Sequence, residues 1–189
     1  MQLILASTSA YRKTLLARLG VPFECISPNF DESLSPSLAP ASLVEYNSRG
    51  KAAAVAKVFP GACIIASDQI ALCEQRVLGK PGNFTKAAEQ LRQMSGKRIT
   101  FLTGLAVYHG TNLHYECIPY DVEMRHLSDQ EISTYLEREQ PFDCAGSFKS
   151  EGLGIALFER MHGNDPTALI GLPLIRLSQI IKPLNIEFF

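Results

Sequence analysis

Residues 3–20 read LILASTSAYRKTLLARLG. The apolar run Leu3–Ala6 is followed by Ser7-Thr8-Ser9, which is typical of a buried strand that ends in a turn. From Ser9 onward, leucines recur on one helical face until Gly20 ends the pattern. The chain therefore opens with a strand that leads directly into a helix, which favours an α/β fold.

The rest of the chain continues to interleave the two kinds of element. Helices are expected at about 42–58, 84–94, 128–139 and 173–181, and strands at about 22–27, 62–66, 70–73, 76–78, 98–109, 114–126 and 154–160. The strand at 62–66 is expected to stop at Ser67-Asp68-Gln69, and Ser128 with Glu131 forms a capping box. We predict the α/β class, with a mixed sheet flanked by helices. Residues 1–189 are expected to form a single domain of two lobes with a cleft between them.

Composition limits the possible functions. The chain has 189 residues, of which 46% are hydrophobic and 20% charged, so it is expected to be globular. A chain of this length buries roughly 70% of its unfolded surface and needs no disulfide or metal to stabilise it. Its 18 basic and 19 acidic residues give a net charge of −1. Because proteins that hold nucleic acid usually carry a basic excess, we expect no nucleic-acid partner and a small local site for any phosphate.

Cysteine usage and the N-terminus indicate the compartment. The five cysteines are widely spaced with no CxxC pair, so buried free thiols are favoured over redox or metal roles. The N-terminus has no basic segment followed by a signal-peptide core, and no stretch approaches the ~18 apolar residues of a membrane helix. We expect a cytoplasmic protein without a membrane partner. The sequence is compatible with a homodimer but does not determine the oligomeric state.

The start of the first predicted helix carries an unusual charge pattern. With Ser9 as the N-cap, Arg12 occupies the third helical position and Lys13 follows it. Cations there oppose the helix dipole, at a cost of about 0.3–1 kcal/mol each. Free N–H groups, nearby hydroxyls and Arg12 would together bind a phosphate. A plain hydroxyl cap with exposed basic residues is an equal alternative.

Two further residues lie where chemistry is common. Asp68 follows a fully apolar strand, a frequent position for a metal ligand or general base, although an Asx-turn also explains it. Lys80 lies between Gly79 and Pro81, where the proline restricts its backbone; a solvated turn lysine is the alternative. Further segments with charged residues accompany them: Asp31-Glu32, Lys51 and Lys149-Ser150-Glu151. Such a mixture suits a metal-bound polyphosphate, and neither a Walker A nor a GxGxxG motif is present.

These residues fall in motifs that resemble one family throughout the chain. Residues 5–16 resemble the LASxSPRRxxLL opening of Maf-like nucleotide pyrophosphatases. The other matching motifs follow in order: Asp31-Glu32, Lys51-Ala52, Ser67-Asp68-Gln69, Gly79-Lys80-Pro81, Thr103-Gly104, residues 146–152 and Gly171-Leu172-Pro173-Leu174.

The resemblance implies an activity, a cofactor and a fold. A nucleoside triphosphate would be hydrolysed between its α and β phosphates with the help of a divalent metal, Mg²⁺ or Mn²⁺, in an architecture like that of inosine triphosphatases. Asp68 would be the proton acceptor, and Glu32 together with Asp68 would hold the metal. The implied phosphate contacts are Ser7, Arg12, Lys51 and Lys80.

The departures from the family pattern indicate the substrate. Much of the family has Pro-Arg where this chain has Ala10-Tyr11, and the dTTP/UTP-preferring branch has Thr and Gln in place of Gln69 and Glu151. The combination is similar to the branch that prefers 7-methyl-GTP. Tyr11 would stack on the cationic base for roughly 0.5–2 kcal/mol, and Glu151 would offer it a carboxylate. An inosine-, dTTP- or UTP-type pyrophosphatase and a non-catalytic nucleotide-binding regulator of septum formation are the alternatives.

Overall fold

The computed structural model describes residues 1–32, 38–186 and 188, and its chain divides into two compact units. Unit 1 contains residues 1–69, 103–118 and 165–189, and unit 2 contains residues 70–102 and 119–164. The strands are β1 (Leu3–Ala6), β2 (Glu24–Ile26), β3 (Cys63–Cys73), β4 (Arg76–Leu78), β5 (Arg98–His109), β6 (Asn112–Met124) and β7 (Phe158–His162). The α-helices are α1 (Ala10–Ala17), α2 (Pro40–Ala56), α3 (Phe84–Met94), α4 (Asp129–Glu139), α5 (Pro166–Ile170) and α6 (Leu174–Ile181). Short 3-10 helices are η2 (Ala145–Ser147), η3 (Leu153–Leu157) and η4 (Lys182–Leu184).

The strands form a mixed sheet in the order β2-β1-β3-β5-β6-β7, with β4 paired to β3. β1 runs parallel to both β2 and β3, whereas the β3–β4 and β6–β7 pairs are antiparallel. A two-residue turn at Gly110-Thr111 joins β5 to β6, as expected for an antiparallel hairpin. The predicted α/β class with a mixed sheet flanked by helices is confirmed.

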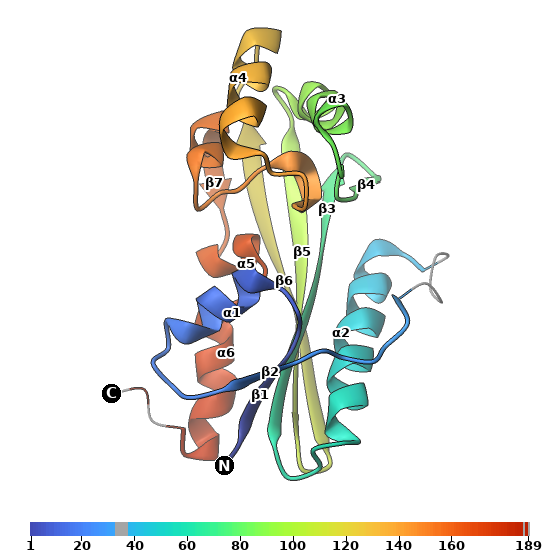
Figure 1. Cartoon of the computed structure of the whole chain (residues 1–189), viewed down its shortest axis with the longest axis vertical. Coiled ribbons are helices and arrows are strands. Elements are labelled where there is room, and N and C mark those ends of the chain that lie inside the picture. Colours follow the sequence, from blue (N-terminus) through green and yellow to red (C-terminus); the bar gives the residue numbers. More distant parts are fainter. Residues whose placement is uncertain (33–37, 187, 189) are drawn as a thin grey trace. The chain divides into compact units, whose positions relative to one another are not determined.

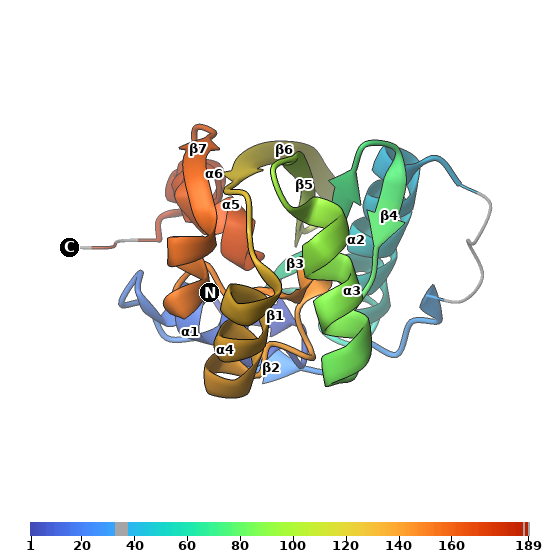
Figure 2. The same ribbon diagram turned by 90° about the horizontal axis from the view of Figure 1, so that it is seen from above.

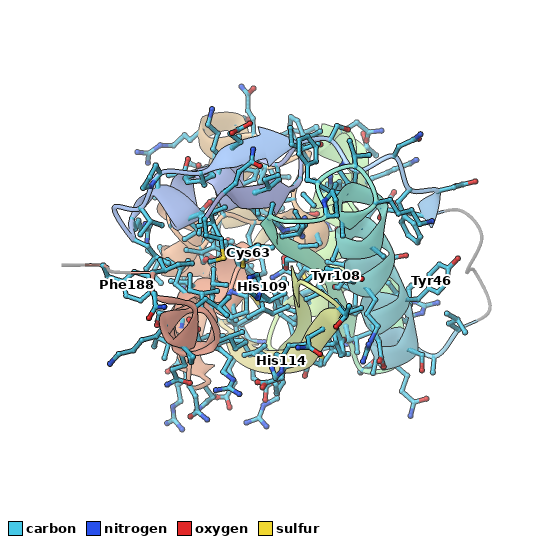
Figure 3. All side chains as sticks on the ribbon, turned by 90° about the horizontal axis from the view of Figure 1, so that it is seen from below. Tyr46, Cys63, Tyr108, His109, His114 and Phe188 are labelled. Atoms are coloured by element: carbon cyan, nitrogen blue, oxygen red, sulfur yellow. The ribbon has the colours of Figure 1, made fainter. Side chains whose placement is uncertain are left out.

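Unit 1 has helices on both faces of its part of the sheet (Figure 1). Leu3 and Leu5 of β1 pack into one core with residues of α1 and α6. Ile4 and Ala6 point to the other face and pack into a second core with residues of α2. Because successive side chains of a strand alternate between faces, a strand that is apolar at every position must be covered on both sides. Figure 3 shows the buried Cys63 inside this unit and the exposed Tyr46 on α2.

Unit 2 is built around α3, α4 and an aromatic cluster. α3 and α4 pack side by side (Figure 2). Phe148 stacks edge-on against Phe101 and Phe158, with ring centroids 5.4 and 4.8 Å apart. The predicted capping box is confirmed, since Ser128 Oγ accepts from the Glu131 N–H and Glu131 Oε2 accepts from the Ser128 N–H. None of the helices described is both long and apolar enough to cross a membrane.

Three local predictions are wrong, and one short helix was missed. β3 does not stop at residues 67–69 but continues to Cys73, so Asp68 lies inside the strand. The strand expected at 154–160 begins at Phe158, after η3, and the short α5 was not predicted. All five cysteines are free, but only Cys63 and Cys73 are buried. These errors share a cause, because tertiary contacts decide burial and strand continuation at positions where the local pattern is short.

Candidate functional site

The loop from β1 to α1 presents hydroxyl groups at the beginning of a helix. Ser9 is the N-cap of α1, and its Oγ accepts a hydrogen bond from the N–H of Arg12 at 3.4 Å. Oγ of the buried Ser7 accepts from the N–H of Ser9 at 3.1 Å. A hydroxyl that accepts in this way still has a hydrogen to donate. The positive end of the helix dipole and the Ser7 hydroxyl therefore favour an anion here.

Arg12 is fixed by the turn that follows α5. Its Nε donates to the carbonyl oxygen of Gly171 at 2.9 Å, so an anion would have to be bound through the Nη groups. Desolvation lowers the pKa of the Arg12 guanidinium, and the charges of Asp68 and Glu32 act in the opposite direction. The carboxylates of Asp68 and Glu32 therefore lie close enough to the Arg12 guanidinium to interact with it electrostatically.

A lysine and two carboxylates form the centre of the site. Lys51 Nζ of α2 lies 2.8 Å from Asp68 Oδ1 of β3 and 3.1 Å from Glu32 Oε1. The Lys51 and Asp68 side chains are only 8% and 12% exposed, whereas the Glu32 side chain is 53% exposed. A buried ion pair is joined here to a carboxylate that solvent reaches, which suits the binding of a charged ligand.

Asn47 belongs to this cluster, although the sequence analysis did not identify it. Its Nδ2 donates to Asp68 Oδ2 at 3.0 Å. Asn47 lies four residues before Lys51 in α2, so both side chains extend from the same helical face. That spacing was the signal in the sequence, and it could have been used once Lys51 was chosen.

Gln69 faces α5. Its Nε2 lies 2.9 Å from Thr103 Oγ1, 2.7 Å from the Ala168 carbonyl oxygen and 3.1 Å from the Leu169 carbonyl oxygen. Thr103 Oγ1 donates to the same Ala168 oxygen at 2.8 Å. The amide nitrogen of this predicted specificity residue therefore holds the last turn of α5.

The turn after α5 connects these contacts to Arg12. The Gly171 carbonyl that accepts from Arg12 also accepts from Ser67 Oγ at 2.8 Å. Gly171 adopts φ 123°, a conformation in which a side chain would be strained. The buried Asp165 caps α5 through the Thr167 N–H at 3.1 Å and accepts from the N–H of Ile175 in α6 at 2.8 Å. One buried carboxylate therefore fixes the segment that orients Arg12.

In unit 2, the loop with Glu151 is anchored to α4. The Lys149 N–H donates to the Tyr135 hydroxyl at 3.1 Å, and Lys149 Nζ donates to the Glu139 carbonyl oxygen at 3.2 Å. Glu139 Oε2 accepts from the Leu153 N–H at 2.8 Å. Glu151 itself is exposed. The loop is held at both ends, and Glu151 lies on its surface.

Lys80 is also an exposed residue of unit 2. Gln90 of α3 donates through Nε2 to the carbonyl oxygen of the preceding Gly79 at 3.1 Å. Gln90 Oε1 accepts from Ser147 Oγ at 2.5 Å. Gln90 thereby joins two of the motifs found in the sequence, a link that the sequence analysis did not find.

The oxygen donors at the centre of the site suit a hard divalent cation. Within residues 1–32, 38–186 and 188, no group of three or more His, Cys, Asp or Glu side chains gathers as a metal cage. Mg²⁺ commonly takes one or two carboxylates together with waters and substrate phosphates. Asp68 and the exposed Glu32, which both contact Lys51, supply carboxylates of this kind.

The chain combines a mixed α/β sheet fold with a buried lysine–carboxylate centre. A solved structure of the Staphylococcus aureus Ham1 protein superposes with a TM-score of 0.55 at 13% identity, covering 97% of this chain and all of that one. The predicted inosine triphosphatase-like architecture is confirmed by this likeness.

The sequence profile of the Maf-like proteins matches residues 2–184, and the chain belongs to that family. Two relatives named 7-methyl-GTP pyrophosphatase, from Colwellia psychrerythraea and Pseudomonas fluorescens, are each 49% identical over 187 residues. They cover 98% of this chain and 94% and 97% of their own lengths. A relative of the same name from Pseudomonas syringae pv. tomato is 50% identical over 181 residues, 95% of this chain and 94% of its own.

Proposed function

We propose that this protein is a nucleoside triphosphate pyrophosphatase that hydrolyses 7-methyl-GTP to 7-methyl-GMP and pyrophosphate. The observation that carries this proposal is the buried Lys51–Asp68 pair, with 2.8 Å between Nζ and Oδ1. The Asp68 carboxylate also interacts electrostatically with Arg12. The name shared by relatives at 49–50% identity over nearly the whole chain supports the choice of substrate.

Glu32 and Asp68 would hold the divalent cation, Mg²⁺ or Mn²⁺. When bound, such an ion supplies Lewis-acid stabilisation to phosphate oxygens. Both ligands are carboxylates, which these hard cations prefer over nitrogen or sulfur.

The cations and hydroxyls of the chain would bind the triphosphate. Arg12 offers its Nη groups because Nε is already bonded to Gly171. Ser7 adds a hydroxyl donor beside the start of α1, and Lys51 and Lys80 add ammonium groups. These groups would neutralise the charge that accumulates on the α-phosphate and on the departing pyrophosphate.

Asp68 is the proposed general base. It would accept a proton from a water molecule as the water oxygen bonds to the α-phosphorus. The bond from that phosphorus to the bridging oxygen then breaks, and its electrons leave with pyrophosphate. Asp68 is suited to this role because both of its carboxylate oxygens are held, Oδ1 by Lys51 and Oδ2 by Asn47.

Tyr11, Gln69 and Glu151 are the proposed specificity residues. Tyr11 would stack on the methylated base, whose positive charge favours an aromatic face. Glu151 would pair with that charge or with the guanine edge. Gln69 would act through α5, since its amide nitrogen is bonded to the Ala168 and Leu169 carbonyl oxygens.

The nucleotide substrate and the five free cysteines support the cytoplasm as the compartment, because cytoplasmic thiols stay reduced.

The test is pyrophosphate release from a panel of 7-methyl-GTP, GTP, ITP, dTTP and UTP with Mg²⁺ and with Mn²⁺. We expect 7-methyl-GTP to be hydrolysed fastest. Asp68→Asn should lower kcat by about 10²–10⁴-fold and leave nucleotide affinity nearly unchanged, as for loss of a general base. Asp129→Asn is the matched control, because the Asp129 side chain is 77% exposed on α4.

Each alternative gives its own result. Faster hydrolysis of dTTP, UTP or ITP would replace the proposed substrate. No pyrophosphate from any nucleotide, together with nucleotide-induced thermal stabilisation, would favour a regulator without turnover. Unchanged kcat in Asp68→Asn would remove Asp68 from the mechanism.

A further inference from the structure

Asn47 is a buried residue whose side-chain amide, within the described residues, forms a hydrogen bond through its nitrogen but not through its oxygen. The residue is 5% exposed in the middle of α2, and its Nδ2 donates to Asp68 Oδ2 at 3.0 Å. Its Oδ1 is buried and has no hydrogen-bond partner among the residues that the structure describes. A buried acceptor without a partner costs stability and calls for an explanation.

The orientation of this amide follows from chemistry. If the amide were turned over, Oδ1 would face the Asp68 carboxylate, and two acceptors would repel each other. The contact with Asp68 therefore requires Nδ2 on that side, and the unpaired Oδ1 is a consequence of the contact. An aliphatic side chain with the same number of heavy atoms would avoid the unpaired acceptor but would lose the donor.

Asp68 is consequently held by two donors from one helix. Lys51 donates to Oδ1 at 2.8 Å, and Asn47 donates to Oδ2 at 3.0 Å. Two contacts on opposite oxygens restrict the rotation of the carboxylate about its Cβ–Cγ bond more tightly than the Lys51 contact alone. Lys51 also contacts Glu32 and neutralises carboxylate charge. Asn47 is uncharged, so its hydrogen bond orients the Asp68 carboxylate without neutralising it.

We propose that Asn47 is a positioning residue for hydrolysis, which holds the plane of the Asp68 carboxylate through Nδ2. This inference rests on the proposed function, since it concerns the same base. The unpaired Oδ1 is the stability cost that accompanies this role.

The test compares Asn47→Leu with Ser48→Ala. Ser48 is the matched control because its Oγ is also buried in α2 and, in the part of the chain that the structure describes, has no hydrogen-bond partner. It therefore makes no hydrogen bond to Asp68. For Asn47→Leu we expect kcat for 7-methyl-GTP to fall about 10- to 100-fold, as for a misplaced catalytic group, with KM changed less than about 3-fold. Its melting temperature should stay within about 4 °C of wild type, because removing the unpaired acceptor offsets the lost hydrogen bond. Ser48→Ala should leave kcat unchanged.

A second measurement separates positioning from a structural role. In the Asp68→Asn background, Asn47→Leu should lower the residual rate no further, because a residue that acts through Asp68 has nothing left to position. If Asn47→Leu proves unstable, Asn47→Ala takes its place in both comparisons.

The outcomes are distinct. An unchanged kcat in Asn47→Leu, or a further loss in the Asp68→Asn background, would overturn the role of Asn47 while wild-type turnover leaves the proposed function standing. A wild-type protein that releases no pyrophosphate from any nucleotide would overturn both.

Discussion

Lys51 contacts two carboxylates that differ in exposure, and their contributions to stability should differ accordingly. Its partner Asp68 is 12% exposed, and its partner Glu32 is 53% exposed. Removing one member of a buried ion pair leaves an uncompensated charge in the protein, whereas a solvent-exposed pair contributes little.

We therefore expect Lys51→Met to lower the free energy of unfolding by about 3–5 kcal/mol. Glu32→Gln, which removes only the exposed contact, should cost less than about 1 kcal/mol. Urea denaturation of both variants and of wild type measures the difference. Equal losses in the two variants would show that burial does not set the strength of these contacts.

Cys63 should make the free energy of unfolding depend on pH, independently of catalytic activity. Burial in the core of unit 1 raises the pKa of its thiol from 9.0 to about 11. An acid whose pKa is raised by folding stabilises the protein fully below its unfolded pKa, and this contribution is lost as the pH rises through the folded pKa. The relevant window is therefore pH 9 to 11.

The expected result is a difference between wild type and Cys63→Ala that changes across this window. Relative to the alanine variant, wild type should lose up to about 2–3 kcal/mol of unfolding free energy between pH 8.5 and pH 11. Chemical denaturation at several pH values under reducing conditions measures it. The comparison cancels the titration of other groups, and a constant difference would contradict the buried neutral thiol.

Among the secondary-structure elements, the α5–α6 turn depends on Asp165. This buried carboxylate accepts from the N–H groups of Thr167, Ile175 and Arg176, at 3.1, 2.8 and 3.2 Å. The same turn supplies the Gly171 carbonyl that orients Arg12. Its geometry should therefore affect both folding and substrate binding.

We expect Asp165→Ala to lower the unfolding free energy by about 3 kcal/mol, because three part-buried N–H groups lose a charged acceptor. KM for the nucleotide should rise as well, since Arg12 loses its support. Asp129→Ala is the control, because Asp129 lies in the exposed first turn of α4. Denaturation and steady-state kinetics measure the two effects. A loss no greater than that of the control would contradict the role of Asp165 in the turn.

At the scale of helices and strands, the sequence predicted those features that depend on residues close together in the chain. The strand Leu3–Ala6, the cap at Ser9 and the capping box at Ser128 each rest on neighbouring residues, and all three are confirmed. The continuation of β3 through Asp68 depends on pairing with strands that come later in the chain. The donors to the Asp68 carboxylate, Lys51 and Asn47, lie 17 and 21 residues away. Asn47 and Asp165 were missed for the same reason, because partners distant in sequence give them their importance.

Across the whole molecule, the interleaving of apolar strands with helices was enough to predict the fold class. Strands that are apolar at every position need helices on both faces, and unit 1 has them. The candidate site residues belong to both units of the chain. Seven of them, Ser7, Tyr11, Arg12, Glu32, Lys51, Asp68 and Gln69, are in unit 1, and Lys80 and Glu151 are in unit 2.

Substitution of Lys80 therefore tests whether a residue of unit 2 takes part in binding the triphosphate. If its ammonium binds a phosphate, Lys80→Met should lower kcat/KM by about 10- to 100-fold, the value of a hydrogen bond to a charged group. Pyrophosphate should inhibit this variant more weakly, whereas inhibition by 7-methylguanosine, which has no phosphate, should stay the same. Lys86→Met is the matched control, because Lys86 is an exposed lysine of the same unit. If both inhibitors weaken equally, Lys80 supports the site generally and binds no phosphate.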